Sequence, residues 1–356
     1  MSIARWILTG SVCLFATIGI IAFIKKNPST PPPPLSKPAV KPALTPVPIV
    51  PHTPPTSSIT LAKKAENSNL VAPNSEQNFS LTLQPEKTSA IEDFPQVDRI
   101  HQLFNTKGVK LPIVDTITYN SKVEWLKGRP AWIADYAVHY STSRHFIARS
   151  LNGRPDYFTQ KISTGGLFNV LRKDKDIQFY LLADISRFKL GLYYFDKGTN
   201  ERVLIKTYSI GLGRLDPHSP SGCATPLGLY ALGNKIAVYQ PGTMGLLGGK
   251  EVEMVRVFGT RWIPFGQEIE GCTSPAKGLG LYGIPLIEQE NNEGKTQFVD
   301  NCAFLNTNEG DGGIRLASED INEIFSIVIT RPSFVLLVKD FRDARLPGIE
   351  VDLPLH

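Results

Sequence analysis

The stretch FYLLADISRFKLGLYYF, residues 179–195, decides the fold of the larger part of this 356-residue chain. Its first seven residues are nearly all apolar, and from Phe188 to Tyr194 every second residue is large and apolar. A period of two is typical of a strand that lies on a β-sheet. The turn DKGTN (196–200) and the run VLIKTYSI (203–210) continue the pattern, which predicts three strands joined by short turns.

Weaker signals of the same kind follow along the chain. Short apolar or alternating runs predict further strands at residues 229–232, 253–258 and 334–338. Apolar residues then recur at helical spacing at Ile321, Ile324, Phe325 and Val328, behind a potential capping residue, Ser318. Residues 179–340 are therefore expected to form a mostly β, β-sandwich-like domain with one late helix, followed by a C-terminal tail at 341–356.

A smaller α+β domain is expected at residues 91–178. Its pattern predicts a helix at 97–104, strands at 123–125 and 131–140, a helix at 144–152 and a strand ending at 170. The cluster Ser141-Thr142-Ser143 is placed to cap the second helix. The segments IARSLNG (147–153) and ISTGGLFNVL (162–171) resemble a LysM module, a family that binds glycan strands of peptidoglycan or chitin. A small α/β domain without that activity fits the same spacing.

The first 90 residues are of a different kind. Residues 6–24 carry no charge and are long enough to span a bilayer as a helix, which predicts a transmembrane anchor within residues 1–26. A cleaved signal peptide is the alternative. Residues 27–90 hold 14 of the 28 prolines, and this composition predicts a disordered, semi-rigid spacer. A docking site for a proline-recognition module is the alternative there.

Composition excludes several classes of function. The formal charge of +5 is small, and the basic residues are interspersed with acids, so no nucleic-acid surface is expected. The four cysteines are too few for a disulfide scaffold, and none forms a CxxC pair that would indicate zinc. No metal and no cofactor are therefore expected.

Four parts of residues 179–340 resemble, in order, the motifs of the L,D-transpeptidase (YkuD-type) family. They are FYLLADISRFKLGLYYF (179–195); TYSIGLGR (207–214) with TPLGLY (225–230); GTRWI (259–263) with GLGLYG (278–283); and GDGGIRL (310–316) with SEDI (318–321). In that family a cysteine thiolate attacks a peptidoglycan stem peptide, and a histidine accepts the thiol proton. The resemblance thus implies a protein of the cell envelope that acts on or binds peptidoglycan.

The two main catalytic positions are occupied by residues that cannot perform this chemistry. The resemblance places Gly313 at the position of the cysteine and Tyr282 at the position of the histidine. Glycine offers no nucleophile, and a phenol with an unperturbed pKa near 10 is almost fully protonated at neutral pH. The resemblance also implies that Arg315, Gly283 and Gly312 bind substrate. The family's reaction is therefore expected to be lost.

Two other arrangements of cysteines remain open. Cys223 lies five residues from His218, and such a pair could supply a different nucleophile. The alternative is that Cys223 is a thiol in a turn without a catalytic role. Cys272 and Cys302 could form a disulfide in an oxidising compartment.

The expected function is that of a catalytically inactive protein that binds peptidoglycan stem peptides and glycan strands or scaffolds wall enzymes. The resemblance and residues 6–24 together predict a single-pass protein of the bacterial inner membrane, with its folded part in the periplasm or cell envelope. An active transpeptidase or peptidase that uses Cys223 is one alternative. A purely structural anchor between membrane and partner proteins is the other.

Overall fold

The computed structural model describes residues 93–152, 162–234, 236–329 and 331–354. The predicted anchor at 6–24 and the predicted spacer at 27–90 lie outside these residues. In the described part of the chain, no helix is both long and apolar enough to cross a membrane. All described residues belong to one compact unit, Leu83–His356. The predicted domain boundary at residue 178 stays a prediction.

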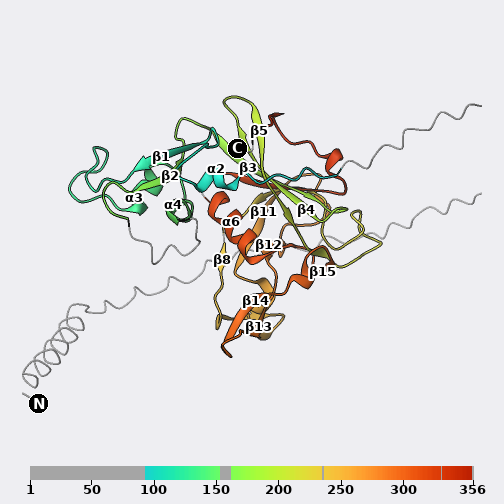
Figure 1. Ribbon diagram of the computed structural model, residues 1–356. Helices are drawn as coiled ribbons and strands as arrows, with labels where there is room; N and C mark the ends of the chain where they lie inside the picture. Colours follow the sequence, from blue (N-terminus) through green and yellow to red (C-terminus); the bar gives the residue numbers. More distant parts are fainter. Residues whose placement is uncertain (1–92, 153–161, 235, 330, 355–356) are drawn as a thin grey trace, which may run out of the picture. The chain divides into compact units, whose positions relative to one another are not determined.

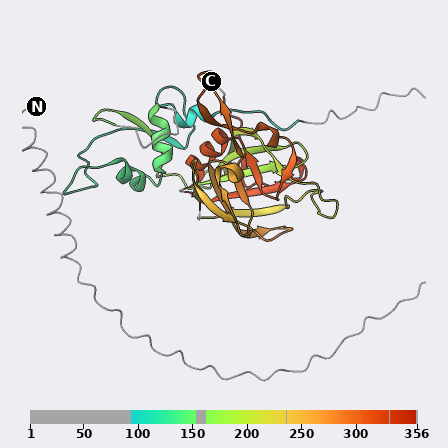
Figure 2. The ribbon, with the colours of Figure 1, turned by 90° about the horizontal axis from the view of Figure 1, so that it is seen from below.

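The prediction of a mostly β protein is confirmed (Figure 1). The main strands pair into one curved, half-barrel sheet, where a sandwich-like arrangement was expected. The order across this sheet is β16 (Ile314–Leu316), β12 (Gly280–Gly283), β11 (Arg261–Glu270), β7 (Gly228–Leu232), β17 (Ser333–Val338), β3 (Ile177–Asp184), β4 (Lys189–Asp196), β5 (Glu201–Ser209) and β18 (Ile349–Glu350), with β8 (Ala237–Val238) paired to β11. Late strand β17 therefore lies between β7 and β3, as the mixed colours in Figure 2 show.

The opening hairpin forms the centre of the sheet. β3 and β4 pair in antiparallel register, and both are buried along almost their whole length. Alternate side chains of β3 enter two different cores: Phe179 and Leu181 pack on one face, and Tyr180 and Leu182 on the other. Strands covered on both faces read as near-continuous apolar runs, which explains why residues 179–185 contain so few polar residues.

Each face of the sheet has its own cover. Helix α6 (Ser318–Val328) buries Ile321, Ile324 and Ile327 in the larger core. The opposite face is covered in part by the chain after β17, which contributes Phe341 and Leu346. The residues predicted as a C-terminal tail are thus folded onto the sheet, through the 3₁₀ turn η2 (Phe341–Asp343) and the pairing of β18 with β5.

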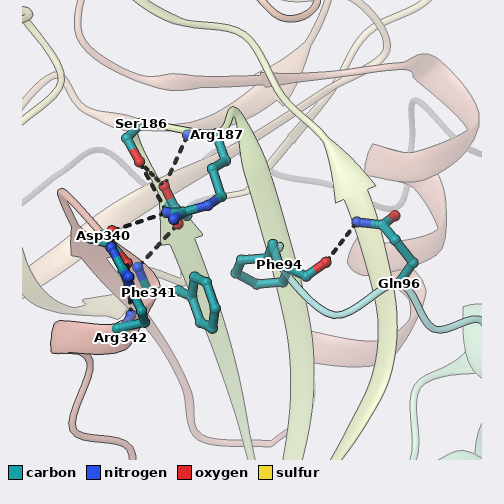
Figure 3. Close-up of polar contacts among 8 residues, drawn as sticks. Phe94, Gln96, Ser186, Arg187, Asp340, Phe341 and Arg342 are labelled. Atoms are coloured by element: carbon teal, nitrogen blue, oxygen red, sulfur yellow. Dashed lines mark hydrogen bonds and ion pairs between the residues drawn. The ribbon is translucent and has the colours of Figure 1, made fainter. Parts of the chain in front are cut away.

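A buried carboxylate, that of Asp184, holds the segment after β17 against the sheet through hydrogen bonds (Figure 3). Asp184, at the end of β3, is fully buried and accepts hydrogen bonds from Ser186 Oγ at 2.8 Å, Arg187 Nη1 at 2.8 Å and the Phe341 backbone N–H at 3.0 Å. The Phe341 ring contacts Phe94 edge-on, with centroids 5.1 Å apart. The corner therefore ties the two ends of the described chain to the central strands.

The smaller set of elements precedes β3. It consists of α2 (Ile100–Phe104), β1 (Val114–Thr118), α3 (Ile133–His139), α4 (Arg144–Asn152) and β2 (Leu167–Leu171), with β1 antiparallel to β2. The predicted cap of α4 is confirmed: Ser143 Oγ accepts a hydrogen bond from the Phe146 N–H at 2.8 Å and donates one to the Ser326 carbonyl at 2.6 Å.

Three predicted strands are wrong. Residues 123–125 belong to a tight turn, in which Val123 forms only an isolated bridge to Leu126. Residues 131–140 contain helix α3, because the Asp135 side chain accepts the Trp132 N–H at 2.8 Å and so satisfies the first turn of a helix. Residues 253–258 contain the short helix α5 (Val255–Phe258), which follows the hairpin of β9 (Met244–Leu247) and β10 (Lys250–Glu253).

The remaining elements are two short strand pairs and a 3₁₀ turn that precede α6 in the sequence. They are the hairpin of β13 (Leu286–Glu290) and β14 (Thr296–Asp300), the 3₁₀ turn η1 (Cys302–Phe304), and the parallel pair β6 (Leu212–Gly213) and β15 (Asn308–Gly310). Asp300, at the end of β14, accepts the Ser318 N–H at 2.8 Å. The predicted helix is confirmed, but its first turn is capped by Asp300 and not by the Ser318 side chain.

Candidate functional site

Parallel strand pairing brings together Tyr282 and Gly313, the two positions that the sequence resemblance predicts as the former catalytic ones. β12 and β16 lie side by side at one edge of the main sheet, and Tyr282 is in register with Arg315. Gly313 directly precedes β16. Tyr282 and Gly313, which belong to different motifs, therefore lie side by side at this edge of the sheet.

The Tyr282 ring occupies the space in which a side chain at position 313 would lie. A Cβ atom built on Gly313 would be 2.6 Å from the Gly280 carbonyl oxygen and 3.2 Å from Tyr282 Cδ1, and closer still to Tyr282 Cε1. Real Cβ atoms do not approach other heavy atoms so closely. The Gly313 backbone is outside the left-handed region, so the obstacle to a side chain is space and not backbone conformation.

Tyr282 is held in this position by other aromatic rings. Its side chain is 4% exposed, and its ring stacks on Trp262 at a centroid distance of 5.3 Å and meets Phe258 edge-on at 5.5 Å. Burial raises the pKa of the Tyr282 phenol, and the nearby Arg315 offsets this only in part. The phenol is therefore a weaker base catalyst at neutral pH than an ordinary tyrosine.

Arg315 lies between two rings. It is 8% exposed, and its guanidinium carbon is 4.6 Å from the Phe304 ring centroid and 5.7 Å from that of Tyr282. Its Nη1 donates a 3.3 Å hydrogen bond to the Glu309 carbonyl, whereas its buried Nε has no hydrogen-bond partner. In this geometry the guanidinium supports the Tyr282 ring through cation–π contact. Its predicted role in binding substrate stays a prediction.

The two glycines predicted to bind substrate allow close backbone packing. Gly312 has a φ of 112°, and a Cβ there would lie 2.8 Å from the Ala224 carbonyl oxygen. A Cβ on Gly283 would be 3.1 Å from Gly259 Cα. Both positions therefore favour glycine for structural reasons, whatever ligand they meet.

The candidate second nucleophile, Cys223, is part of the main core. Its thiol is 2% exposed and lies 3.7 Å from Ser221 Oγ and 3.8 Å from the Thr225 carbonyl oxygen. His218 is on the surface, where its backbone N–H donates to Asp216. Within the residues that the structure describes, the thiol and the imidazole are not in hydrogen-bond contact.

The other two cysteines in the described part of the chain are free thiols. Cys272 is half-buried and Cys302 is exposed, so the disulfide considered from the sequence is not formed. Across the described ranges, no group of three or more His, Cys, Asp or Glu side chains is arranged to hold a metal ion.

A second candidate site lies on the smaller set of elements, and sequence reasoning missed it. A cavity of about 470 Å³ is lined by Tyr119, by residues 130–134 and by the α4 side chains Arg144 and Leu151. Trp132, which stands at this cavity, is 67% exposed. An indole so open to solvent beside a cavity is the usual platform for a flat, partly apolar ligand. Sequence reasoning missed this cavity because it expected a strand at residues 131–140, where the start of helix α3 lines the cavity.

Comparisons with known proteins give the following. No family model matches the chain, and no curated protein matches it. Among solved structures it is similar to Bd1075 from Bdellovibrio bacteriovorus, with a TM-score of 0.29 and 13% identity over 46% of this chain and 48% of that chain. It is also similar to the helical cell shape determining protein Pgp2 from Campylobacter jejuni, with a TM-score of 0.30 and 15% identity over 49% and 51% of the two chains. The chain spans about half the length of each of these proteins.

Proposed function

We propose that this chain is a catalytically inactive, L,D-transpeptidase-like protein of the cell envelope that binds peptidoglycan. The observation that carries the proposal is the contact between Tyr282 and Gly313, because the ring of one fills the space for a nucleophile at the other. A site that had only lost its thiol would still have room for one. Here the volume has been filled as well.

The loss of activity follows from both positions together. Removing the nucleophile of a catalytic constellation costs on the order of a millionfold in turnover. The buried Tyr282 phenol, with its raised pKa, does not replace the missing base. Cys223 does not restore the pair, because its thiol is buried and His218 points to solvent. The geometry therefore gives no support to the alternative of an active enzyme.

The binding function rests on the Trp132 cavity. The apolar face of a sugar ring stacks on an exposed indole, and polar groups at the rim of a cavity bind its hydroxyls. The cavity supplies both kinds of residue, since Trp132 is exposed and Arg144 and Tyr119 line the same space. Its volume of about 470 Å³ lies within the usual range for small-ligand sites. We therefore infer that a glycan strand binds there.

The proposed location follows from the same assignment. Residues 6–24 would anchor the chain in the inner membrane, and residues 27–90 would hold the folded part away from it, in the envelope. Peptidoglycan would then be within reach.

Two measurements test this function. Incubation with a carbapenem, an acylating inhibitor of the resembled family, should leave the intact mass of the full-length protein unchanged, since position 313 offers no thiol. A covalent adduct that maps to Cys223 would contradict the inactive assignment.

The second measurement is a pull-down with purified peptidoglycan sacculi. Trp132→Ala should weaken binding by about two- to tenfold and reduce the retained protein accordingly, because stacking of this kind contributes about 0.5–1.5 kcal/mol. Leu246→Ala is the matched control, since Leu246 is 78% exposed and lies on β9, outside the cavity. Equal retention of wild type and Trp132→Ala would exclude this cavity as the glycan site.

A further inference from the structure

A separate cavity of about 430 Å³ lies where the end of β7 and the strand β11 meet the end of α6. Its walls are mainly aliphatic. They are formed by Leu232, Ile236, Ile263, Val328 and Ile329. One charged side chain, Arg331, lines the same space. The cavity therefore combines aliphatic walls with the polar residues Asn234 and Ser333 and a single cation.

The charge of Arg331 is poorly compensated. Its Nη2 donates only long hydrogen bonds, of 3.3 Å to the Arg172 carbonyl and 3.5 Å to the Tyr140 carbonyl, and its buried Nε has no hydrogen-bond partner. Within residues 93–152, 162–234, 236–329 and 331–354, no carboxylate forms an ion pair with Arg331. Asp176 acts on it at longer range, and the Asp176 carboxylate is 3.4 Å from Lys197 Nζ.

Such an arrangement is costly unless something completes it. Burial lowers the pKa of the Arg331 guanidinium, which shows that the charged form loses solvation at this place. Arg331 is half-buried, and a partly desolvated charge without an ionic partner destabilises a fold. An anion that binds beside it recovers part of this loss. Arg149, which also lies against α6, differs in this respect, because it is ion-paired to Glu319 and lies 3.5 Å from Glu323.

We propose that this cavity binds the C-terminal carboxylate of a short peptide, with the carboxylate at Arg331 and the last aliphatic side chain against Ile263 and Val328. A carboxylate carries one negative charge, and the cavity offers one cation, so the charges match. A phosphate dianion would need further cations or N–H donors. The exposed Asn234 side chain at the rim supplies hydrogen-bonding capacity for a peptide amide, which a free fatty acid would leave unused.

This inference rests on the proposed function, because stem peptides are the short peptides that a peptidoglycan-binding protein meets. It adds a site that is distinct from the strand edge at Tyr282 and Gly313. It also uses different residues from the Trp132 cavity, so the two can be tested separately.

The test is a calorimetric titration of the full-length protein in detergent with N-acetyl-D-alanyl-D-alanine. The corresponding C-terminal amide and hexanoate serve as comparison ligands. The acid should bind, and the amide should bind at least tenfold more weakly, because a hydrogen bond to a charged group contributes about 1.5–3 kcal/mol. Arg331→Gln should weaken binding of the acid by a similar factor. Arg256→Gln is the matched control, since Arg256 is an exposed arginine ion-paired to Glu253 and Glu288.

A second variant keeps the test decisive if Arg331→Gln does not fold. Ile236→Trp would narrow the chamber from its half-buried rim and leave the arginine in place, and it should also abolish binding of the acid. Equal affinity for acid and amide, or unchanged affinity in a folded Arg331→Gln or Ile236→Trp protein, would overturn the proposal. Tighter binding of hexanoate than of the dipeptide would overturn the peptide assignment. If the wild-type protein does not bind the dipeptide but is still retained by sacculi through Trp132, this inference is refuted and the proposed function stands.

Discussion

Replacing Gly313 by cysteine probes the coupling between positions 313 and 282, whose catalytic origin is part of the proposed function. The new Cβ would lie 2.6 Å from the Gly280 carbonyl oxygen and in steric conflict with the Tyr282 ring. The ring cannot move freely, because Trp262 and Phe258 pack against it. Gly313→Cys alone should therefore cost about 1–3 kcal/mol of unfolding free energy, the usual range for overpacking a core.

Tyr282→His removes the conflict from the other side. Replacing the buried phenol by the smaller imidazole leaves unfilled volume among the aromatic rings, and should cost about 2–3 kcal/mol, less than the 3–5 kcal/mol of a complete aromatic truncation. In the double variant the cysteine side chain occupies part of that volume. The two costs should therefore fail to add, with the double variant more stable than the sum of the singles by about 0.5–3 kcal/mol.

Urea unfolding of the four proteins, followed by circular dichroism, measures this coupling. Costs that add to within about 0.3 kcal/mol would refute the contact between positions 282 and 313. The same four proteins test the chemistry. The double variant alone should gain a carbapenem adduct by intact mass, because a thiol needs a base and a base needs a thiol. A folded double variant without an adduct would refute the assignment of one of the two positions or the integrity of the surrounding site.

Three further predictions concern stability. Asp184→Ala should cost about 1–3 kcal/mol, because it leaves the Ser186 hydroxyl and the Phe341 N–H at this buried corner without their acceptor, while Arg187 keeps Asp340 at 3.2 Å. Asp174→Ala, at an exposed ion pair, should change stability by less than about 0.5 kcal/mol; urea midpoints compare the two variants. Burial, with Arg261 and Arg144 nearby, lowers the pKa of His145 to about 4, so the unfolded chain binds a proton near pH 6.5 that the folded chain refuses until about pH 4. Stability should therefore fall as the pH drops from 7 to 4, and His145→Gln should flatten this fall in urea midpoints; an unchanged slope would contradict the burial effect. Gly312→Ala should lower the melting temperature more than Gly222→Ala, since both have positive φ but only Gly312 also meets a carbonyl oxygen; equal losses would show that strain acts without packing.

Much of the main sheet could be predicted because its information is local. Residues 179–185 and 334–338 are apolar runs that a sheet buries on both faces, and β3 and β17 form there. The helix at 318–328 followed from its apolar spacing. By contrast, residues 131–140 alternate like a strand but form α3, because the Asp135 carboxylate satisfies the first helical turn. Hydrogen bonds of this kind override a short hydrophobic pattern, and the pattern contains no sign of them.

The site shows the same division between local pattern and contact. The motifs around Tyr282 and Gly313 identify each position separately, whereas the parallel pairing of β12 and β16 decides that the two meet. That contact changes the meaning of both substitutions. A return to cysteine at position 313 conflicts with the tyrosine, and a return to histidine at position 282 opens a gap beside a residue without a side chain. Each single reversal therefore loses stability and gains no catalytic pair, so packing itself stabilises the proposed inactive state.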